Sequence, residues 1–154
     1  MTQMRPLADY SGKHRPMQDG DMLPASIVPP AQGTSVDVSK TAHGFVAGQP
    51  VRVSVDGLGV ASWALAQATA DLSQVATHFV VDVVDANTFR ASNSGFWTIP
   101  GLTVYGNLLL GATAGGVVSH VSALPSNVAI QPLGIADATG LHINITSYVR
   151  DVTP

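Results

Sequence analysis

Histidine is the residue here best suited to bind a metal or to transfer protons near neutral pH, yet the spacing of the histidines predicts neither role. Zinc sites usually contain ligands only a few residues apart in the chain. No His-x-x-x-His or His-x-His pair is present, and the absence of Cys excludes a thiolate site. The sequence therefore predicts no metal site and no cofactor; the histidines are His14, His43, His78, His120 and His142.

The carboxylates and hydroxyls offer little for catalysis. All ten acidic residues are Asp. Glycoside hydrolysis needs two facing carboxylates, whereas Asp82 and Asp85 flank the end of a predicted strand, with Asp82 toward solvent and Asp85 in a turn. Ser119 and His120 are adjacent, so their side chains leave an extended chain on opposite faces and cannot form a nucleophile–base pair. The sequence therefore predicts that the protein is not an enzyme.

Four aromatic residues form the remaining candidate site. Aromatic side chains dominate both protein cores and subunit interfaces, and they also stack against sugar rings. We expect an oligomer interface, and a sugar-binding platform is the alternative that the sequence leaves open. The four residues are Trp63, Phe96, Trp97 and Tyr105.

The elements that would position these side chains are predicted to be β-strands. Val51, Val53 and Val55 alternate with polar residues, the period of a half-buried strand, and Asp56-Gly57 follows as a turn. Asp85-Ala86-Asn87 is a second predicted turn. Further strands are expected at 60–67, 79–84, 88–92, 96–99, 107–110, 116–121, 128–136 and 141–146, with Leu141, Ile143 and Ile145 on the buried face of the last.

Composition and turn spacing together predict the fold class. Gly and Pro are frequent, Val dominates the apolar residues, and the only candidate helix is the short segment Ala68–Val75. Turn signals recur every 8–12 residues, a spacing typical of sandwiches and barrels. We therefore predict an all-β fold, an antiparallel β-sandwich or small tulip-like barrel over residues 34–154, with an extended N-terminal arm over residues 1–33.

The predicted arm differs from the rest of the chain. It holds all four Met and five of the ten Pro, which interrupt both helices and strands. An extended segment of this kind docks on a partner or remains a disordered tail, and the sequence leaves both open. If the arm docks, the expected contact residues are Arg5, Tyr10, Lys13, Arg15, Met17, Met22 and Leu23.

Charge is scarce in the predicted β-domain, with only 11 ionisable acidic or basic residues between Val36 and Pro154. A lone domain of this size usually covers its surface with charge, so this composition predicts that copies or partners bury part of it. The net charge of −3 argues against nucleic acid as a partner. No run of about 18 apolar residues is present to span a membrane, and no signal peptide is predicted.

Several motifs resemble those of small β-domains in virion proteins of tailed bacteriophages. Residues 41–52, TAHGFVAGQPVR, are similar to an opening motif HGF-x-x-G-x-x-V-R of these domains. Residues 80–97 resemble their V-x-D-A-N-x-F strand pair, and 100–119 and 123–145 resemble the G-L-T and P-L-G-x-A segments of their second half. Residues 11–29 resemble the G-D-x-L-P lead-in of fibre, appendage and head-decoration proteins.

This resemblance implies a non-enzymatic structural protein of the virion, either a head-decoration (cement) protein or a short fibre. It implies a homo-oligomer, often a trimer, whose partners are other capsid, tail or collar proteins. The alternative within the same group is a receptor- or glycan-binding tip of a fibre. Neither nucleic acid nor a membrane is an expected partner.

Overall fold

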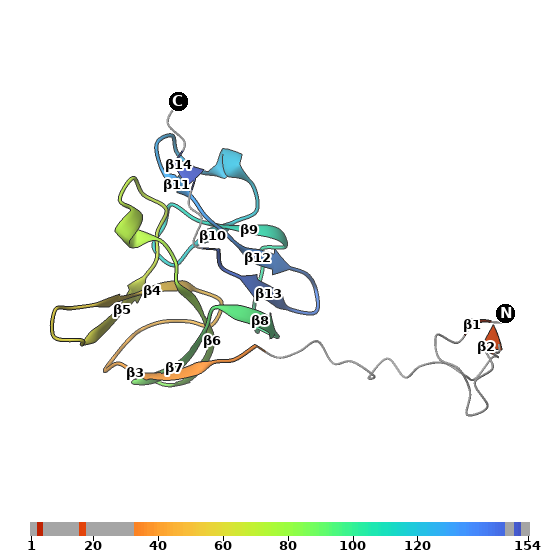
Figure 1. Cartoon of the computed structure of the whole chain (residues 1–154), viewed down its shortest axis with the longest axis horizontal. Helices are drawn as coiled ribbons and strands as arrows, with labels where there is room; N and C mark the ends of the chain where they lie inside the picture. The colour runs from red at the N-terminus through yellow and green to blue at the C-terminus, as the bar shows by residue number, and fades with distance from the viewer. Residues whose placement is uncertain (1–2, 5–15, 18–32, 147–149, 152–154) are drawn as a thin grey trace. The chain divides into compact units, whose positions relative to one another are not determined.

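The protein is represented by a computed structural model that describes residues 3–4, 16–17, 33–146 and 150–151 (Figure 1). The chain divides into two units, Met1–Pro30 and Ala31–Pro154, and each is considered by itself. The described part of the first unit is one antiparallel pair of short strands, β1 (Gln3–Met4) and β2 (Pro16–Met17). The rest of the predicted arm lies outside the described residues.

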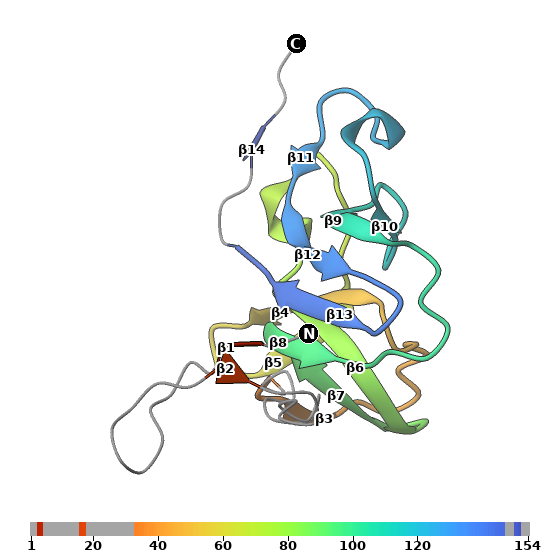
Figure 2. The same ribbon diagram turned by 90° about the vertical axis from the view of Figure 1, so that its right-hand side faces the viewer.

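The second unit contains two five-stranded antiparallel sheets (Figures 1 and 2). The first sheet has the order β3 (Val36–Ser39), β7 (Thr88–Ser92), β6 (His78–Asp85), β4 (Pro50–Val55) and β5 (Ala61–Leu65). The second has the order β10 (Val117–Val118), β9 (Gly106–Leu110), β12 (Pro132–Ala136), β13 (Leu141–Asn144) and β8 (Ser94–Trp97). A separate short pair joins β11 (Ala129–Ile130) to β14 (Arg150–Asp151).

The two sheets pack around a shared apolar core, so the all-β sandwich prediction is confirmed. Phe79 and Val81 of β6 enter this core from the first sheet. Leu108, Leu133 and Leu141 enter it from three strands of the second sheet, and each is fully buried. Burial of one such side chain contributes about 1.5–3 kcal/mol to folding, so these contacts hold the sheets together.

The first sheet also buries residues on its opposite face. Val80 and Phe89 belong to a second apolar cluster, which the segment between β3 and β4 covers with Phe45. The ring of Phe45 meets that of Phe89 edge-on, with centroids 5.1 Å apart. His43 joins this cluster; its Nδ1 accepts a hydrogen bond from the Phe45 N–H at 2.9 Å, and its Nε2 lies 2.9 Å from the Asp85 carbonyl oxygen. The imidazole therefore has a structural role here.

Burial along β4 departs from the predicted pattern. Val51 is fully buried, but Val53 is only half-buried and Val55 is 64% exposed. The prediction that all three share a buried face is wrong at the end of the strand, because β4 and β5 extend past the cover that protects Val51. On β13 the predicted alternation is confirmed: Leu141 and Ile143 are buried while the residues between and after them are exposed.

The candidate helix over Ala68–Val75 does not form. This segment forms only a single 3₁₀ turn, η1 (Leu72–Gln74), and Asp71 caps it by accepting a hydrogen bond from the Ser73 N–H. A second 3₁₀ turn, η2 (Val121–Ala123), follows β10, so the strand predicted over 116–121 is reduced to Val117–Val118. No α-helix occurs within the described residues.

The change from the first sheet to the second takes place over one residue. β7 ends at Ser92 and β8 begins at Ser94, so the connection between the strands predicted at 88–92 and 96–99 is shorter than expected. The Ser92 hydroxyl is buried and lies 2.7 Å from the Thr34 carbonyl oxygen and 2.8 Å from that of Ser94. These contacts fix the chain where it crosses between the layers.

Candidate functional site

The four predicted interface aromatics fall into two groups. Phe96, Trp97 and Tyr105 belong to β8 and the segment that follows it, beside the second sheet. The Phe96 ring packs against that of His142, with centroids 4.6 Å apart, and Trp97 donates from Nε1 to the Ser94 carbonyl oxygen at 3.2 Å. Tyr105 is the most open of the three, with 54% of its surface exposed. Tyr105 directly precedes β9, which β12 and β13 separate from β8 in the sheet, so only Phe96 and Trp97 share a strand.

Trp63 lies apart from that group, on β5 of the first sheet. It is half-buried and meets Phe89 edge-on at 5.6 Å between centroids. It also contacts the His78 ring at 5.1 Å. Partial burial lowers the pKa of His78 below its usual value of 6.5, because the charged imidazolium is less well solvated there. Much of the indole is thus committed to packing within its own chain.

Strand β5 is an edge strand without the features that usually protect an edge. Within the described part of the chain, it pairs with β4 alone. Its sequence, Ala-Ser-Trp-Ala-Leu, has no charged residue and no Pro. Exposed edges in natural proteins generally carry Lys, Pro or a bulge, because unpaired N–H and C=O groups otherwise recruit another strand. The β5 edge is therefore a candidate docking surface.

The direction of the free backbone groups on β5 follows from its ladder with β4. Val60 accepts from the Asp56 N–H at 3.1 Å, and Ala66 donates to the Pro50 carbonyl oxygen at 3.0 Å. Hydrogen-bonded pairs alternate along an antiparallel ladder. The intervening even-numbered residues therefore bond to β4, and Ala61, Trp63 and Leu65 direct their backbone groups away from the sheet.

The chain turns between β4 and β5 at one end of the first sheet (Figure 1), and the apolar side chains around this turn are exposed. Leu58 is 90% exposed, and Val55 and Val60 on either side of it are 64% and 60% exposed. The Asp56 carboxylate orders this turn, since its Oδ1 accepts hydrogen bonds from the Leu58 and Val60 N–H groups at 2.9 Å each. We call Val55, Leu58 and Val60 the apolar tip. It is contiguous with the unprotected edge.

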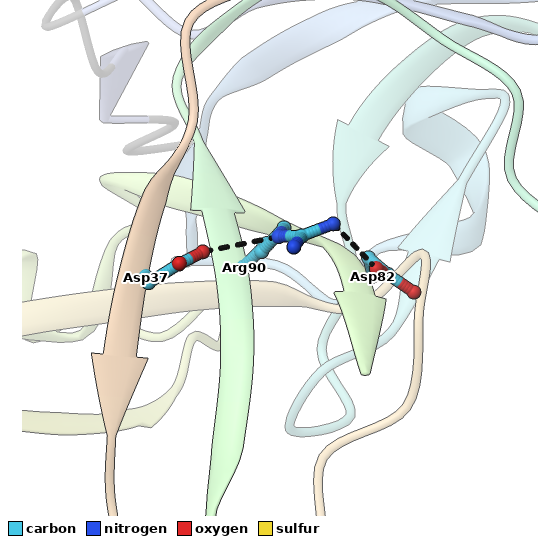
Figure 3. Close-up of polar contacts among 3 residues, drawn as sticks. All are labelled: Asp37, Asp82 and Arg90. Atoms are coloured by element: carbon cyan, nitrogen blue, oxygen red, sulfur yellow. Dashed lines mark hydrogen bonds and ion pairs between the residues drawn. The ribbon is translucent and has the colours of Figure 1, made fainter. Parts of the chain in front are cut away.

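The opposite edge of the same sheet, β3, carries charge (Figure 3). Arg90 on β7 reaches across both neighbouring strands: its Nε lies 3.0 Å from Asp37 of β3, and its Nη1 lies 3.1 Å from Asp82 of β6. All three side chains are substantially exposed, so each pair contributes at most about 1 kcal/mol. The two edges of the sheet therefore differ: the β3 edge carries charged side chains, whereas β5 has none.

The residues considered for catalysis are occupied in other ways. Asp82 pairs with Arg90 at the surface. Asp85 ends β6, where its Oδ1 accepts from the Asn87 N–H at 2.7 Å. His120 caps η2, with Nδ1 2.7 Å from the Ser122 hydroxyl, and so does not activate Ser119. Within residues 33–146, no three His, Asp or Glu side chains are grouped so as to hold a metal ion.

Most of the predicted arm contacts lie outside the described residues. These are Arg5, Tyr10, Lys13, Arg15, Met22 and Leu23. Met17 falls within β2, where its backbone is opposite Gln3. The role of the arm stays a prediction.

Comparison with known proteins gives no match to a family model, to a curated protein or to a solved structure. The likeness to phage virion domains therefore rests on the sequence motifs alone. Among the described residues, no helix has the length and apolar character needed to cross a bilayer.

Proposed function

We propose that this protein is a non-enzymatic structural component of a tailed-bacteriophage particle, and that its β-sandwich associates with further copies of itself. The motif resemblance supports the phage assignment and the predicted docking of the arm on other virion proteins. One observation carries the self-association: the uncharged β5 edge continues into the apolar tip. The same surface in a lone subunit is a liability that closed oligomers remove.

The physical gain from association has two parts. Backbone groups of Ala61, Trp63 and Leu65 gain strand partners, and Leu58, Val55 and Val60 leave water. Complete burial of a Leu or Val side chain is worth about 1.5–3 kcal/mol before the cost of association. The apolar tip is ordered by Asp56 before association, so little further ordering is required there.

Sedimentation velocity of the full chain over a wide dilution range tests this proposal. We expect a species larger than the 15.9-kDa subunit, and the measured mass also tests the trimer implied by the motifs. Ser62→Lys places a charge on the β5 edge and Leu58→Ser removes the centre of the apolar tip, so both are expected to shift the protein to monomer.

The matched control is Ser39→Lys, which adds the same charge at the exposed end of β3, on the opposite edge. It is expected to leave the oligomer intact. A wild-type protein that remains monomeric and folded at every concentration would overturn the self-association, as would an oligomer that Ser62→Lys and Ser39→Lys weaken equally.

A further inference from the structure

A small hollow lies between the turn that joins β12 to β13 and the segment that leads from β8 to β9. Its volume is about 190 Å³. That is below the roughly 300 Å³ at which sites for drug-sized ligands begin, so it suits one small ring. The hollow combines polar groups with one exposed aromatic ring; its lining includes Thr98, Gly101, Leu102, Tyr105, Asp137 and Thr139.

Gly140 allows the β12–β13 turn to approach β8 closely. A Cβ at Gly140 would lie 2.7 Å from the Phe96 ring and 2.5 Å from the Trp97 carbonyl oxygen. The β12–β13 turn therefore sits directly against β8 at this point. The ladder between β9 and β12 pairs Gly106 with Ala136, so Tyr105 and Asp137, which are 32 positions apart in the chain, come to lie next to each other and line the same hollow.

Asp137 has one carboxylate oxygen fixed by the turn and one available. Its Oδ1 accepts hydrogen bonds from the Thr139 N–H at 2.7 Å and the Gly140 N–H at 3.1 Å, and also from the Thr139 hydroxyl. Within the described part of the chain, Oδ2 accepts none. The Thr139 hydroxyl and N–H hold the pKa of this carboxyl below its usual value, so it is ionised at neutral pH.

We propose that this hollow is a carbohydrate-binding subsite that takes a single neutral pyranose ring. Tyr105 offers an aromatic face to the C–H groups of the sugar, and Asp137 Oδ2 accepts hydrogen bonds from its hydroxyls. The negative carboxylate disfavours uronic and sialic acids. A metal ion is a poorer fit, because Asp137 is the only carboxylate or histidine among the described residues that line the hollow.

The affinity of one such site is expected to be low. A pyranose has about 12 non-hydrogen atoms. The binding free energy per non-hydrogen atom that is usual for small ligands then gives an expected Kd of ~1–10 mM. Several copies in an oligomer would raise the avidity by orders of magnitude without any new contact. The site itself does not depend on the self-association proposed above.

The test is a titration of the ¹⁵N-labelled full chain with methyl glycosides of glucose, galactose, mannose and N-acetylglucosamine, followed by amide chemical shifts. At least one of them is expected to cause saturable shifts at Gly106, Thr139 and Gly140. Methyl glucuronide is expected to cause none. No saturable shift from any neutral glycoside up to about 50 mM, well above the expected Kd, would overturn the proposal, as would shifts centred elsewhere.

Two pairs of variants separate a binding role from a structural one. Tyr105→Ala is expected to weaken binding at least tenfold, whereas Tyr105→Phe keeps the ring and stays within about threefold. Asp137→Asn keeps an oxygen for the Thr139 and Gly140 N–H groups but replaces the free acceptor, so it is expected to lose tenfold with the turn amides unshifted. Unchanged binding by Tyr105→Ala or Asp137→Asn would contradict the assignment.

Ile135→Thr provides the control. Ile135 is 54% exposed on β12, near the hollow but not among its lining residues, and its replacement is expected to leave binding unchanged. A sugar that binds a protein found to be monomeric would refute the self-association and leave the subsite standing. The two proposals can therefore fail separately.

Discussion

Gln131 is the buried polar side chain whose removal should cost the fold most. Only 1% of its surface is exposed, and it lies between β11 and β12. Its Oε1 accepts from the Ala76 N–H at 2.8 Å, and its Nε2 donates to the Ala76 carbonyl oxygen at 2.8 Å, with the Thr146 carbonyl oxygen 3.3 Å away. One amide thus satisfies both backbone groups of a residue that is itself 3% exposed.

The substitution Gln131→Leu keeps the size of the side chain and removes both bonds. Each buried backbone group left without a partner costs about 1–3 kcal/mol, so Ala76 alone accounts for about 2–6 kcal/mol. The more apolar Leu recovers about 1–2 kcal/mol. We expect a net loss of about 3 kcal/mol in the free energy of unfolding, or about 10 °C in Tm for a unit of this size.

Urea and thermal unfolding followed by circular dichroism measure this loss. Gln74→Leu is the matched control, because the Gln74 amide makes only surface hydrogen bonds to Asp71 and Ser73, at 3.2–3.3 Å. Its expected cost is below about 0.5 kcal/mol. A loss of less than about 1 kcal/mol in Gln131→Leu would show that the hydrogen bonds between Gln131 and Ala76 contribute little to stability.

Gln131→Glu adds a pH signature to the same test. The introduced carboxylate can accept from the Ala76 N–H but cannot donate to the Ala76 carbonyl oxygen, whereas the protonated acid can. Burial and the facing carbonyl raise the folded-state pKa of the introduced carboxyl above its unfolded value of about 4.3. The variant should therefore lose stability, relative to Gln131→Leu, as the pH rises from about 4 to 7. Parallel pH profiles would contradict this reasoning.

The remaining predictions concern strand burial, one histidine and the arm. Val51→Asp should abolish folding because Val51 is fully buried, while Val55→Asp should cost less than about 0.5 kcal/mol when measured in a Leu58→Ser background that no longer associates, because Val55 is 64% exposed in the single subunit; equal melting temperatures would show that β4 is placed wrongly. Because burial lowers the folded-state pKa of His78, the free energy of unfolding should fall as the pH drops below about 6.5, by at most about 1.4 kcal/mol per pH unit. In His78→Gln the urea midpoint should therefore depend less on pH between about pH 5 and 7.5. The same pH dependence in the variant and the wild type would contradict this role of His78. Deletion of residues 1–30 should leave the circular dichroism of the β-sandwich intact but abolish incorporation into particles; normal incorporation would refute a docking role.

The sequence predicts the strands best where alternation and turn chemistry agree. The turn at 85–87 and the strands around it appear in the structure as β6 and β7, and β13 follows its apolar alternation. The candidate helix over Ala68–Val75 does not form, because alanines in this segment and on either side of it pack in the core between the sheets. Ala66, Ala68 and Ala76 are buried in the core between the sheets, and the Ala68 N–H bonds to the distant Gly111 carbonyl oxygen.

The candidate sites were harder to predict, because they depend on which side chains the packing of the domain leaves exposed. The valine alternation of β4 predicts burial for Val55, but nothing local indicates that the protective cover ends before it. The dipeptide Asp56-Gly57 predicts the turn without predicting an exposed Leu58 at its end. Tyr105 was singled out, whereas its partner Asp137 was not, since the pairing of β9 with β12 that places them together joins segments far apart in the chain.

The segment between β3 and β4 has a consequence for how this chain tolerates change. Surface loops usually accept insertions and substitutions. Phe45 and His43, however, form part of the layer that shields Val80 and Phe89 from solvent. Shortening or exchanging this segment would expose an apolar face of the first sheet. The segment is therefore part of the core, although it connects two strands. Any fragment of the domain intended for expression must begin before it, and useful grafting positions should be sought at other connections.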